Sequence, residues 1–237
     1  MSKMSSPFER TISLIGDFNF KKIQDSNVII FGIGGVGSYA AESLVRVGLG
    51  NITLVDYDII DVTNINRQVH ATTKTIGLPK VKVMKDRLLE INPNLNISIY
   101  EEKVSADNID IFELSKYNYI IDAIDMVSSK ICLIEKAKIL GINIISAMGA
   151  GNKLDPTRFR VDDIFNTKVC PLAKTIRHEL KKRNIDKLKV VYSDETPLKV
   201  NLGDNEKRKA IPGSISYVPP VVGMIITSEV VKDIINS

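Results

Sequence analysis

Four glycines within six residues constrain this chain more than any other feature of its sequence. They lie in the run Gly-Ile-Gly-Gly-Val-Gly at residues 32–37, directly after the apolar residues 27–31. Apolar side chains recur at helical spacing over residues 35–47, and a second apolar run follows at residues 52–56. Short apolar runs of this kind are typical of buried parallel strands. The pattern therefore predicts a strand, a glycine turn, a helix and a second strand, which form a βαβ unit.

Each glycine of this run has a place in a nucleotide-binding turn. Gly32 permits the tight turn, Gly34 and Gly35 let backbone N–H groups approach a phosphate, and Gly37 lets the helix pack close to the strand. Asp56 ends the second strand, where a carboxylate accepts hydrogen bonds from ribose hydroxyls. We therefore predict a nucleotide site, although the glycines do not choose between NAD, FAD and ATP.

Strand and helix patterns alternate beyond this unit, which favours a Rossmann-like, doubly wound and mostly parallel α/β sheet. We expect further strands at residues 97–100, 119–124 and 143–146, and helices at residues 79–91 and 128–140. After residue 151 the chain becomes more charged, with one amphipathic helix at residues 171–183. Residues 217–236 are again apolar, and we expect this segment to end in a helix that packs on the core. We predict one domain over residues 1–237, with a nucleotide-binding core at 8–150 and a basic insertion and C-terminal packing segment at 151–237.

Composition excludes several other classes of protein. The chain has 237 residues, 44% of them hydrophobic, which is enough for a sizeable core. Its two cysteines, Cys132 and Cys170, form no Cys-x-x-Cys pair, so a zinc ribbon or a disulfide framework is not expected, and a reducing cytoplasm fits best. The longest uncharged stretch, residues 211–228, is interrupted by prolines and glycines and does not resemble a membrane span.

Positive charge is concentrated in one part of the chain. Residues 168–209 contain 12 lysines and arginines against 6 aspartates and glutamates, whereas the whole chain has a net charge of only +4. A basic stretch on an otherwise nearly neutral body indicates an anionic partner. The alternative is a solvated, lysine-rich surface without a ligand.

Two cations downstream of Asp56 favour ATP over NAD. An adenylating site holds three phosphates and must neutralise the charge that develops on the α-phosphate and on the departing pyrophosphate. Arg67 and Lys80 could meet that need, although each alone would be an ordinary surface cation.

Five motifs in a fixed order give the chain a resemblance to a known superfamily. They are Gly-x-Gly-Gly-x-Gly at 32–37, Leu-Val-Asp-Tyr-Asp at 54–58, Asn-Ile-Asn-Arg-Gln at 64–68, Gly-Leu-Pro-Lys at 77–80 and Asp-Ala-Ile-Asp at 122–125. This order resembles the ubiquitin-activating-enzyme-like adenylyltransferases, which include the activators of sulfur-carrier proteins. The resemblance covers residues 8–150.

The resemblance implies a role for individual residues. Asp56 would hold the ribose, Arg67 and Lys80 would contact the phosphates, and Asp125 would position Mg²⁺. Arg10 would reach into the site of the other subunit in a homodimer. Without the resemblance, Asp125 would be interpreted as the cap of the following helix. The implied ATP-binding residues are Gly32, Gly34, Gly35, Gly37, Asp56, Asp58, Asn64, Asn66, Arg67 and Lys80, and the implied catalytic residues are Arg10, Arg67, Lys80 and Asp125.

Three later segments point to one branch of the superfamily. They are Ser-Ala-Met-Gly-Ala-Gly-Asn-Lys-Leu-Asp-Pro-Thr at 146–157, Cys-Pro-Leu-Ala-Lys at 170–174 and Gly-Ser-Ile-Ser-Tyr-Val-Pro-Pro at 213–220. They resemble the tRNA threonylcarbamoyladenosine dehydratase family. The resemblance implies ATP-dependent cyclisation of this nucleoside in tRNA through an acyl adenylate, with release of AMP and pyrophosphate. It leaves room for a protein partner of the sulfur-carrier or cysteine-desulfurase type.

A tRNA substrate would give the basic stretch a use, because tRNA binding depends on phosphate contacts. If residues 171–183 are helical, Lys174, Arg177 and Lys181 share one face, and Leu172, Ile176 and Leu180 bury the other. The predicted tRNA-binding residues are Lys174, Arg177, Lys181, Lys182 and Arg183.

Three alternatives remain open at this point. Adenylation of the C-terminal glycine of a sulfur-carrier protein uses the same chemistry, but the zinc cysteines usual in that branch are missing. An NAD-dependent oxidoreductase would need an acid or base, and His70 and His178 are the only histidines. A non-catalytic nucleotide-binding scaffold would not require the full set of charged residues. Cys170, before Pro171, is placed where a helix dipole favours a thiolate, but ring closure needs no thioester.

Overall fold

The structure is a computed structural model that describes residues 6–199 and 212–237. Residues 200–209 of the predicted basic stretch therefore lie outside the described residues. The helices are α1 (Glu9–Asp25), α2 (Gly37–Val47), α3 (Lys80–Ile91), α4 (Val127–Leu140), α5 (Pro171–Lys182) and α6 (Val218–Asn236). The strands are β1 (Asn27–Phe31), β2 (Asn51–Val55), β3 (Asn96–Tyr100), β4 (Tyr119–Asp122), β5 (Asn143–Ala147), β6 (Phe159–Asp163) and β7 (Lys189–Ser193).

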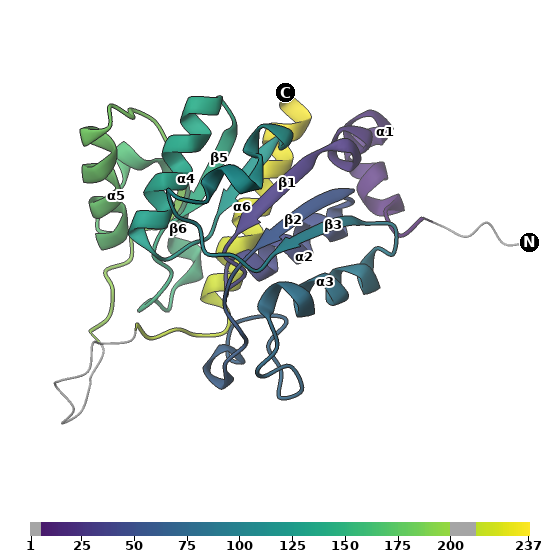
Figure 1. Cartoon of the computed structure of the whole chain (residues 1–237), viewed down its shortest axis with the longest axis horizontal. Coiled ribbons are helices and arrows are strands. Elements are labelled where there is room, and N and C mark those ends of the chain that lie inside the picture. Colours follow the sequence, from purple (N-terminus) through teal and green to yellow (C-terminus); the bar gives the residue numbers. More distant parts are fainter. Residues whose placement is uncertain (1–5, 200–211) are drawn as a thin grey trace, which may run out of the picture.

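The strands form one sheet in the order β3-β2-β1-β4-β5-β7-β6. All neighbouring strands are parallel except β6, which pairs antiparallel with β7 at one edge. From β1 the chain adds β2 and β3 on one side of the sheet and then crosses over to add β4 and β5 on the other side. The carboxyl ends of these parallel strands lie at the same edge of the sheet (Figure 1). Open sheets of this kind bind ligands in the crevice at that edge, between β1 and β4.

Both faces of the sheet are buried, as the apolar runs predict. Along β1, Val28 and Ile30 pack into one core with α2, α3 and α6, whereas Ile29 and Phe31 pack into a second core with α4 and α5. Successive strand residues point to opposite faces, so a strand that is apolar throughout supports two layers of helices. Helix α6 packs against α2 and α1, as expected for the C-terminal segment.

The predicted α/β class and the predicted strands and helices of the core are confirmed, but three elements were not predicted. Helix α1 buries only Ile23 and is kinked at Gly16, whose φ is 80°, so its apolar pattern is weak. Strand β6 is a half-exposed edge strand that ends in two aspartates. Strand β7 lies inside the charged stretch and takes a buried place beside β5. Among the described helices, none is long and apolar enough to cross a membrane.

Candidate active site

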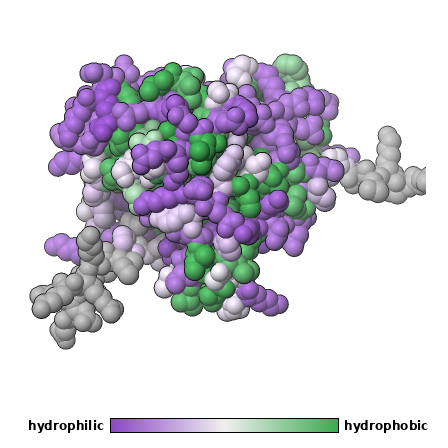
Figure 2. Space-filling view, viewed as in Figure 1, coloured by the Kyte–Doolittle hydropathy of each residue, from purple (hydrophilic) through white to green (hydrophobic). Residues whose placement is uncertain are grey.

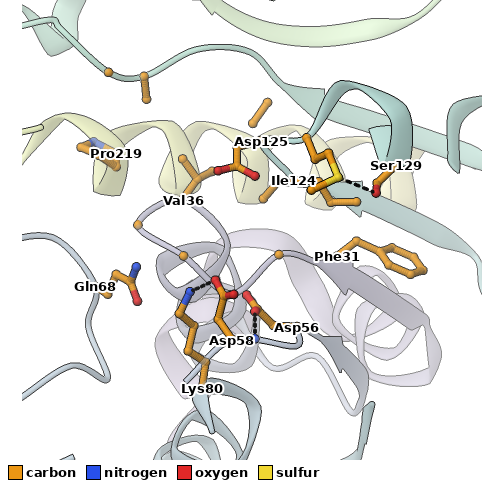
Figure 3. Close-up of a pocket in the computed structure, with 18 of the residues that line it drawn as sticks. Phe31, Val36, Asp56, Asp58, Gln68, Lys80, Ile124, Asp125, Ser129 and Pro219 are labelled. Carbon is orange, nitrogen blue, oxygen red and sulfur yellow. Dashed lines mark hydrogen bonds and ion pairs between the residues drawn. The ribbon is translucent and has the colours of Figure 1, made fainter. Parts of the chain in front are cut away.

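A cavity of about 580 Å³ opens at the carboxyl ends of the parallel strands (Figure 3). Its lining comes from the glycine turn, from the loop that follows β2, and from the segments after β4 and β5. Nine of the residues predicted for ATP or metal binding are among them, namely Gly32, Gly34, Gly35, Asp56, Asp58, Asn64, Arg67, Lys80 and Asp125.

The glycine turn adopts a conformation that other residues would not fit. Gly32 has a φ of 88°, and a Cβ there would lie 2.7 Å from the carbonyl oxygen of Ala123. A Cβ on Gly37, at the first position of α2, would collide with the carbonyl oxygen of Gly32. These glycines therefore bring α2 and the end of β4 against the turn.

The N-terminal ends of five helices converge on the cavity. Val36 before α2, Lys80 of α3, Met126 before α4, Leu172 of α5 and Pro219 of α6 all line it. None of these five helix ends has a side-chain cap. A helix N-terminus carries a partial positive charge and unpaired N–H groups, so the cavity favours an anionic ligand such as a triphosphate.

Asp56 is held at the base of the cavity by the glycine turn. One carboxylate oxygen, Oδ2, accepts a hydrogen bond from the backbone N–H of Ile33 at 2.6 Å, and Oδ1 accepts one from the backbone N–H of Asp58 at 2.9 Å. Burial raises the pKa of this carboxyl, and the positive charge of Lys80 works in the opposite direction. The carboxylate is thus oriented by backbone donors at the place where the sequence predicts ribose binding.

Lys80 places a cation in the wall of the cavity. Its side chain is nearly buried, and its ammonium lies 2.6 Å from Oδ2 of Asp58, which is 46% exposed (Figure 3). The main-chain N–H of Lys80 also donates to the carbonyl of Asp58. Lys80 and Asp58 therefore form an ion pair in the lining of the cavity.

The loop after β2 positions Arg67 beside the glycine turn. Arg67 Nη1 donates to the carbonyl oxygen of Thr63 at 2.8 Å and to Asn66 Oδ1 at 2.9 Å. An added Cβ on Gly35 would lie 3.3 Å from Cγ of Arg67, so the arginine runs along the turn. Asn64 is buried and closes a capping box with Asp61.

Asn66 does not line the cavity, although it was predicted to bind ATP. Its amide donates to the carbonyl oxygen of Ser214 at 3.0 Å, which ties the loop after β2 to the segment before α6. Gln68, in contrast, was not singled out as a site residue. It lines the cavity, is 5% exposed, and its Oε1 has no hydrogen-bond partner in the described part of the chain. The sequence feature that could have indicated a site role for Gln68 is its position in the 64–68 motif.

Asp125 is not a helix cap. Helix α4 begins at Val127 with Met126 as its N-cap residue, and no side chain caps it. The carboxylate of Asp125 instead points into the cavity from the segment after β4 (Figure 3). The structure thus favours the ligand-binding interpretation of this residue over the capping one.

Arg10 lies outside the cavity of its own chain. It is an exposed residue in the first turn of α1, and it is absent from the described residues that line the cavity. Helix α1 precedes β1 and therefore lies toward the opposite end of the sheet (Figure 1).

The five predicted tRNA-binding residues differ in their exposure and in whether they already pair with groups of the same chain. Lys174 is exposed on α5, and the ammonium of Lys181 lies over the ring of Phe165 at 6.0 Å from its centroid. Lys182 and Arg183 both pair with Glu179, and Arg183 also pairs with Glu135. Arg177 is half-buried, and its Nη1 donates to Thr167 Oγ1 at 2.6 Å and to two backbone carbonyls. Arg177 thus fixes α5 to the segment before it, and its guanidinium is less free to bind a tRNA phosphate than the sequence predicts.

The cysteines and histidines offer no alternative chemistry in the cavity. Cys170 is 4% exposed and Cys132 is half-buried. His70 is buried outside the cavity lining, and burial together with Lys80 and Arg87 lowers its pKa to about 4. His178 is exposed on α5. Neither histidine, the acid or base considered for an oxidoreductase, is among the described residues that line the cavity.

Fold and cavity together define a Rossmann-like α/β protein whose cavity, at the carboxyl ends of the strands, is lined by Arg67 and Lys80. The chain belongs to the ThiF family, whose defining sequence pattern matches residues 8–237, and within it to the tRNA threonylcarbamoyladenosine dehydratases.

Two curated relatives and one set of solved structures support this assignment. The tRNA threonylcarbamoyladenosine dehydratase of Bacillus subtilis is 40% identical over 98% of this chain and 96% of that protein. The Escherichia coli enzyme of the same name is 41% identical over 73% of this chain and 65% of that protein. Crystal structures of E. coli TcdA in complex with ATP or with AMP match with a TM-score of 0.89 and 34% identity. They cover 97% of this chain and 94% of that one.

Proposed function

We propose that this protein uses ATP to cyclise threonylcarbamoyladenosine in tRNA, with loss of one water and release of AMP and pyrophosphate. The observation that carries the proposal is the match over nearly the whole chain to a dehydratase whose structure was determined with ATP. The cavity supports it, because it lies at the ligand edge of the sheet and is surrounded by uncapped helix ends.

The proposed chemistry proceeds in two balanced steps. A carboxylate oxygen of the threonyl group attacks the α-phosphorus of ATP, and the bond to pyrophosphate breaks. The neighbouring carbamoyl group then closes on the activated carbonyl and loses a proton. AMP leaves with the electron pair of the C–O bond and with one former carboxylate oxygen. Activation is needed because AMP is a far better leaving group than a carboxylate oxygen.

Residues of the cavity have the character that these steps require. Asp56, oriented by two backbone N–H groups, is proposed to hold the ribose. Lys80 and Arg67 are proposed to bind the phosphates and to stabilise charge that develops during adenylation. The amides of residues 34–37 are proposed to supply further donors at the start of α2.

Asp125 fits a magnesium ion, because it presents an exposed carboxylate to the cavity and Mg²⁺ is commonly held by one or two carboxylates together with substrate phosphates. When bound, the ion would neutralise charge on the phosphates. Asp58 offers a second carboxylate in the same cavity, paired with Lys80.

The proposal is tested with tRNA that carries threonylcarbamoyladenosine. After incubation with the protein, ATP and Mg²⁺, mass spectrometry of the digested nucleosides should show the loss of one water, and only when ATP is present. A nucleoside of unchanged mass would refute the proposed function. ATP–pyrophosphate exchange should be stimulated by this tRNA and not by a sulfur-carrier protein, which separates the proposal from its nearest alternative.

A homodimer is also proposed, in which Arg10 completes the site of the other subunit. Helix α1 exposes two large apolar side chains, Leu14 at 85% and Phe18 at 75%. The loop after β2 projects from the molecule, and Figure 2 shows apolar surface gathered on it, where Ile59 and Val62 are each 60% exposed. A second copy of this chain that covers these faces would bring its Arg10 toward the cavity, since the same loop carries Arg67.

The tRNA surface is proposed to centre on Lys174 and Lys181 of α5, since both are exposed and neither forms a described salt bridge. Helix α5 also contributes Leu172 to the cavity lining, so a strand bound along its lysines would reach the site. A tRNA substrate and two free thiols favour a cytoplasmic protein. The partner of the sulfur-carrier or cysteine-desulfurase type stays a prediction that co-purification would test.

A further inference from the structure

Three polar side chains form a fully buried cluster directly beneath the cavity. Asp122 ends β4, Ser146 is in β5, and Lys130 lies on α4, and each of them has 0% exposure. Lys130 Nζ donates to Asp122 Oδ2 at 2.8 Å and to Ser146 Oγ at 3.0 Å, and Ser146 Oγ donates to Asp122 Oδ2 at 2.5 Å. We name these three residues the buried triad.

The buried triad is tied to two backbone positions of the cavity wall. The third donor of Lys130 reaches the carbonyl oxygen of Ala147 at 3.0 Å, which uses all three hydrogens of the ammonium. The other oxygen of Asp122 accepts a hydrogen bond from the backbone N–H of Ile124 at 3.1 Å. Ile124 and Ala147 both line the cavity, and Asp125 directly follows Ile124.

Stability does not account for charges at this depth. Removing a lysine and an aspartate from water costs several kcal/mol for each ion, and apolar replacement of a buried ion pair is often neutral or stabilising. A satisfied network of this kind does fix geometry, because every donor has one partner in one direction. The triad therefore contributes position rather than stability to the segments after β4 and β5.

We propose that the buried triad is a positioning device for the adenylation step. It holds the segment that carries Asp125 at a fixed distance from the segment at residues 147–149 across the cavity. None of the three side chains touches the ligand space, so they act through the backbone of Ile124 and Ala147. This inference rests on the proposed function, because it assigns the triad to the same site.

The test is the double variant Asp122→Asn with Lys130→Met, which removes both charges while nearly preserving shape. It should unfold within a few degrees of wild type and bind ATP with similar affinity. Its kcat for loss of water should fall by roughly tenfold to 100-fold, as for a small displacement of reacting groups. Ser146→Ala, which keeps the ion pair, should show a smaller loss in the same direction and serves if the double variant does not fold.

Tyr119→Phe is the matched control. Tyr119 lies on the same strand as Asp122 and donates to Asp233 at 2.6 Å, but at the opposite end of β4. This variant removes a hydrogen bond between a buried side chain and a carboxylate, and it should keep the wild-type kcat.

Amide hydrogen exchange of the ligand-free protein supplies a readout that does not depend on the reaction. In the double variant, exchange should rise at residues 123–126 and 147–149 and stay unchanged elsewhere. Wild-type kcat in a folded double variant, or exchange that rises throughout the protein, would overturn the inference. The two proposals can fail separately. If the wild-type protein does not dehydrate the nucleoside, the proposed function is refuted. If amide exchange in the double variant still rises only at residues 123–126 and 147–149, the triad's positioning role stands.

Discussion

Among single residues, Lys80 is expected to matter most for turnover. Its ammonium is the nearly buried cation of the cavity wall, and it is proposed to stabilise charge on the phosphates. Lys80→Ala should therefore fold normally and lose about 100-fold or more in kcat. Lys82→Ala is the control, since Lys82 is an exposed residue of the same helix that pairs with Glu101. Steady-state kinetics and thermal unfolding of both variants give the answer, and a fully active Lys80→Ala protein would contradict the assignment.

His70 should make the protein less stable in mild acid. In the unfolded chain a histidine takes up a proton near pH 6.5, whereas in the folded chain burial and two nearby cations hold the pKa of His70 at about 4. Between these values protons favour the unfolded state, so the free energy of unfolding falls as the pH falls. From pH 7 to pH 5 this residue should account for about 2 kcal/mol.

Urea unfolding at both pH values measures this effect. His70→Asn should reduce the loss of stability on acidification, whereas His178→Asn should not, because His178 is exposed. Equal pH dependence in wild type and His70→Asn would show that the prediction is wrong.

The residues of the site were predictable to different degrees. Asp56, Lys80 and Asp125 stand at strand ends or at a helix start, so their meeting at one edge follows from parallel topology. Gln68 was not predicted, because a glutamine in a loop has no periodicity to reveal its burial. The role of Arg177 was also hidden, since its partner Thr167 lies in a loop before the helix and not on it.

At the level of elements, two glycines of the turn before α2 should differ in what they contribute: Gly34 to ATP binding and Gly37 to folding. A Cβ on Gly34 would meet only the Gln68 amide at 3.9 Å, whereas one on Gly37 would collide with the backbone of Gly32. Gly34→Ala should therefore keep wild-type stability and weaken ATP binding by about tenfold or more, or roughly 1.4 kcal/mol. Gly37→Ala should destabilise the fold itself. Calorimetric titration with ATP and thermal unfolding measure the two effects, and unchanged ATP affinity in Gly34→Ala would place the phosphates elsewhere.

Helix α5 should supply phosphate contacts for tRNA. The double variant Lys174→Ala with Lys181→Ala should weaken the binding of all tRNAs about equally. Each phosphate contact that it removes should flatten the salt dependence of binding by about 0.7–0.9. ATP binding should be unaffected. The control, Lys21→Ala with Lys232→Ala, removes the same charge from α1 and α6. If the α5 variant keeps the wild-type affinity and salt slope, these lysines are only a solvated surface.

The elements that the sequence did not predict share a physical cause. Strand β7 is short and lies among charged residues, and it becomes a strand because it fills the place between β5 and β6. Helix α1 owes its position to a few contacts with α6 and has little apolar periodicity of its own. Tertiary context decides such elements, whereas the strands of the central sheet are apolar enough to be recognised locally.

At the scale of the whole molecule, subunit exchange tests whether Arg10 acts across a dimer. Arg10→Ala and Asp125→Ala should each be nearly inactive alone, and a mixture should regain activity through one intact composite site. Lys80→Ala mixed with Asp125→Ala is the control and should show no rescue, because both residues belong to the same chain's cavity. Failure of the first mixture after confirmed exchange would mean that Arg10 works within its own chain or not at all.

Activation of the threonyl carboxylate as an acyl adenylate leaves a trace in the products that isotope transfer can detect. The protein is given tRNA whose threonylcarbamoyl carboxylate is labelled with ¹⁸O, together with ATP and Mg²⁺, and the AMP and nucleoside products are weighed by mass spectrometry. One labelled oxygen should appear in the phosphate of AMP, and the nucleoside should be lighter by one labelled water. Unlabelled AMP, formed together with a cyclised nucleoside, would contradict activation as an acyl adenylate, because the carboxylate would then never have been bonded to the α-phosphorus.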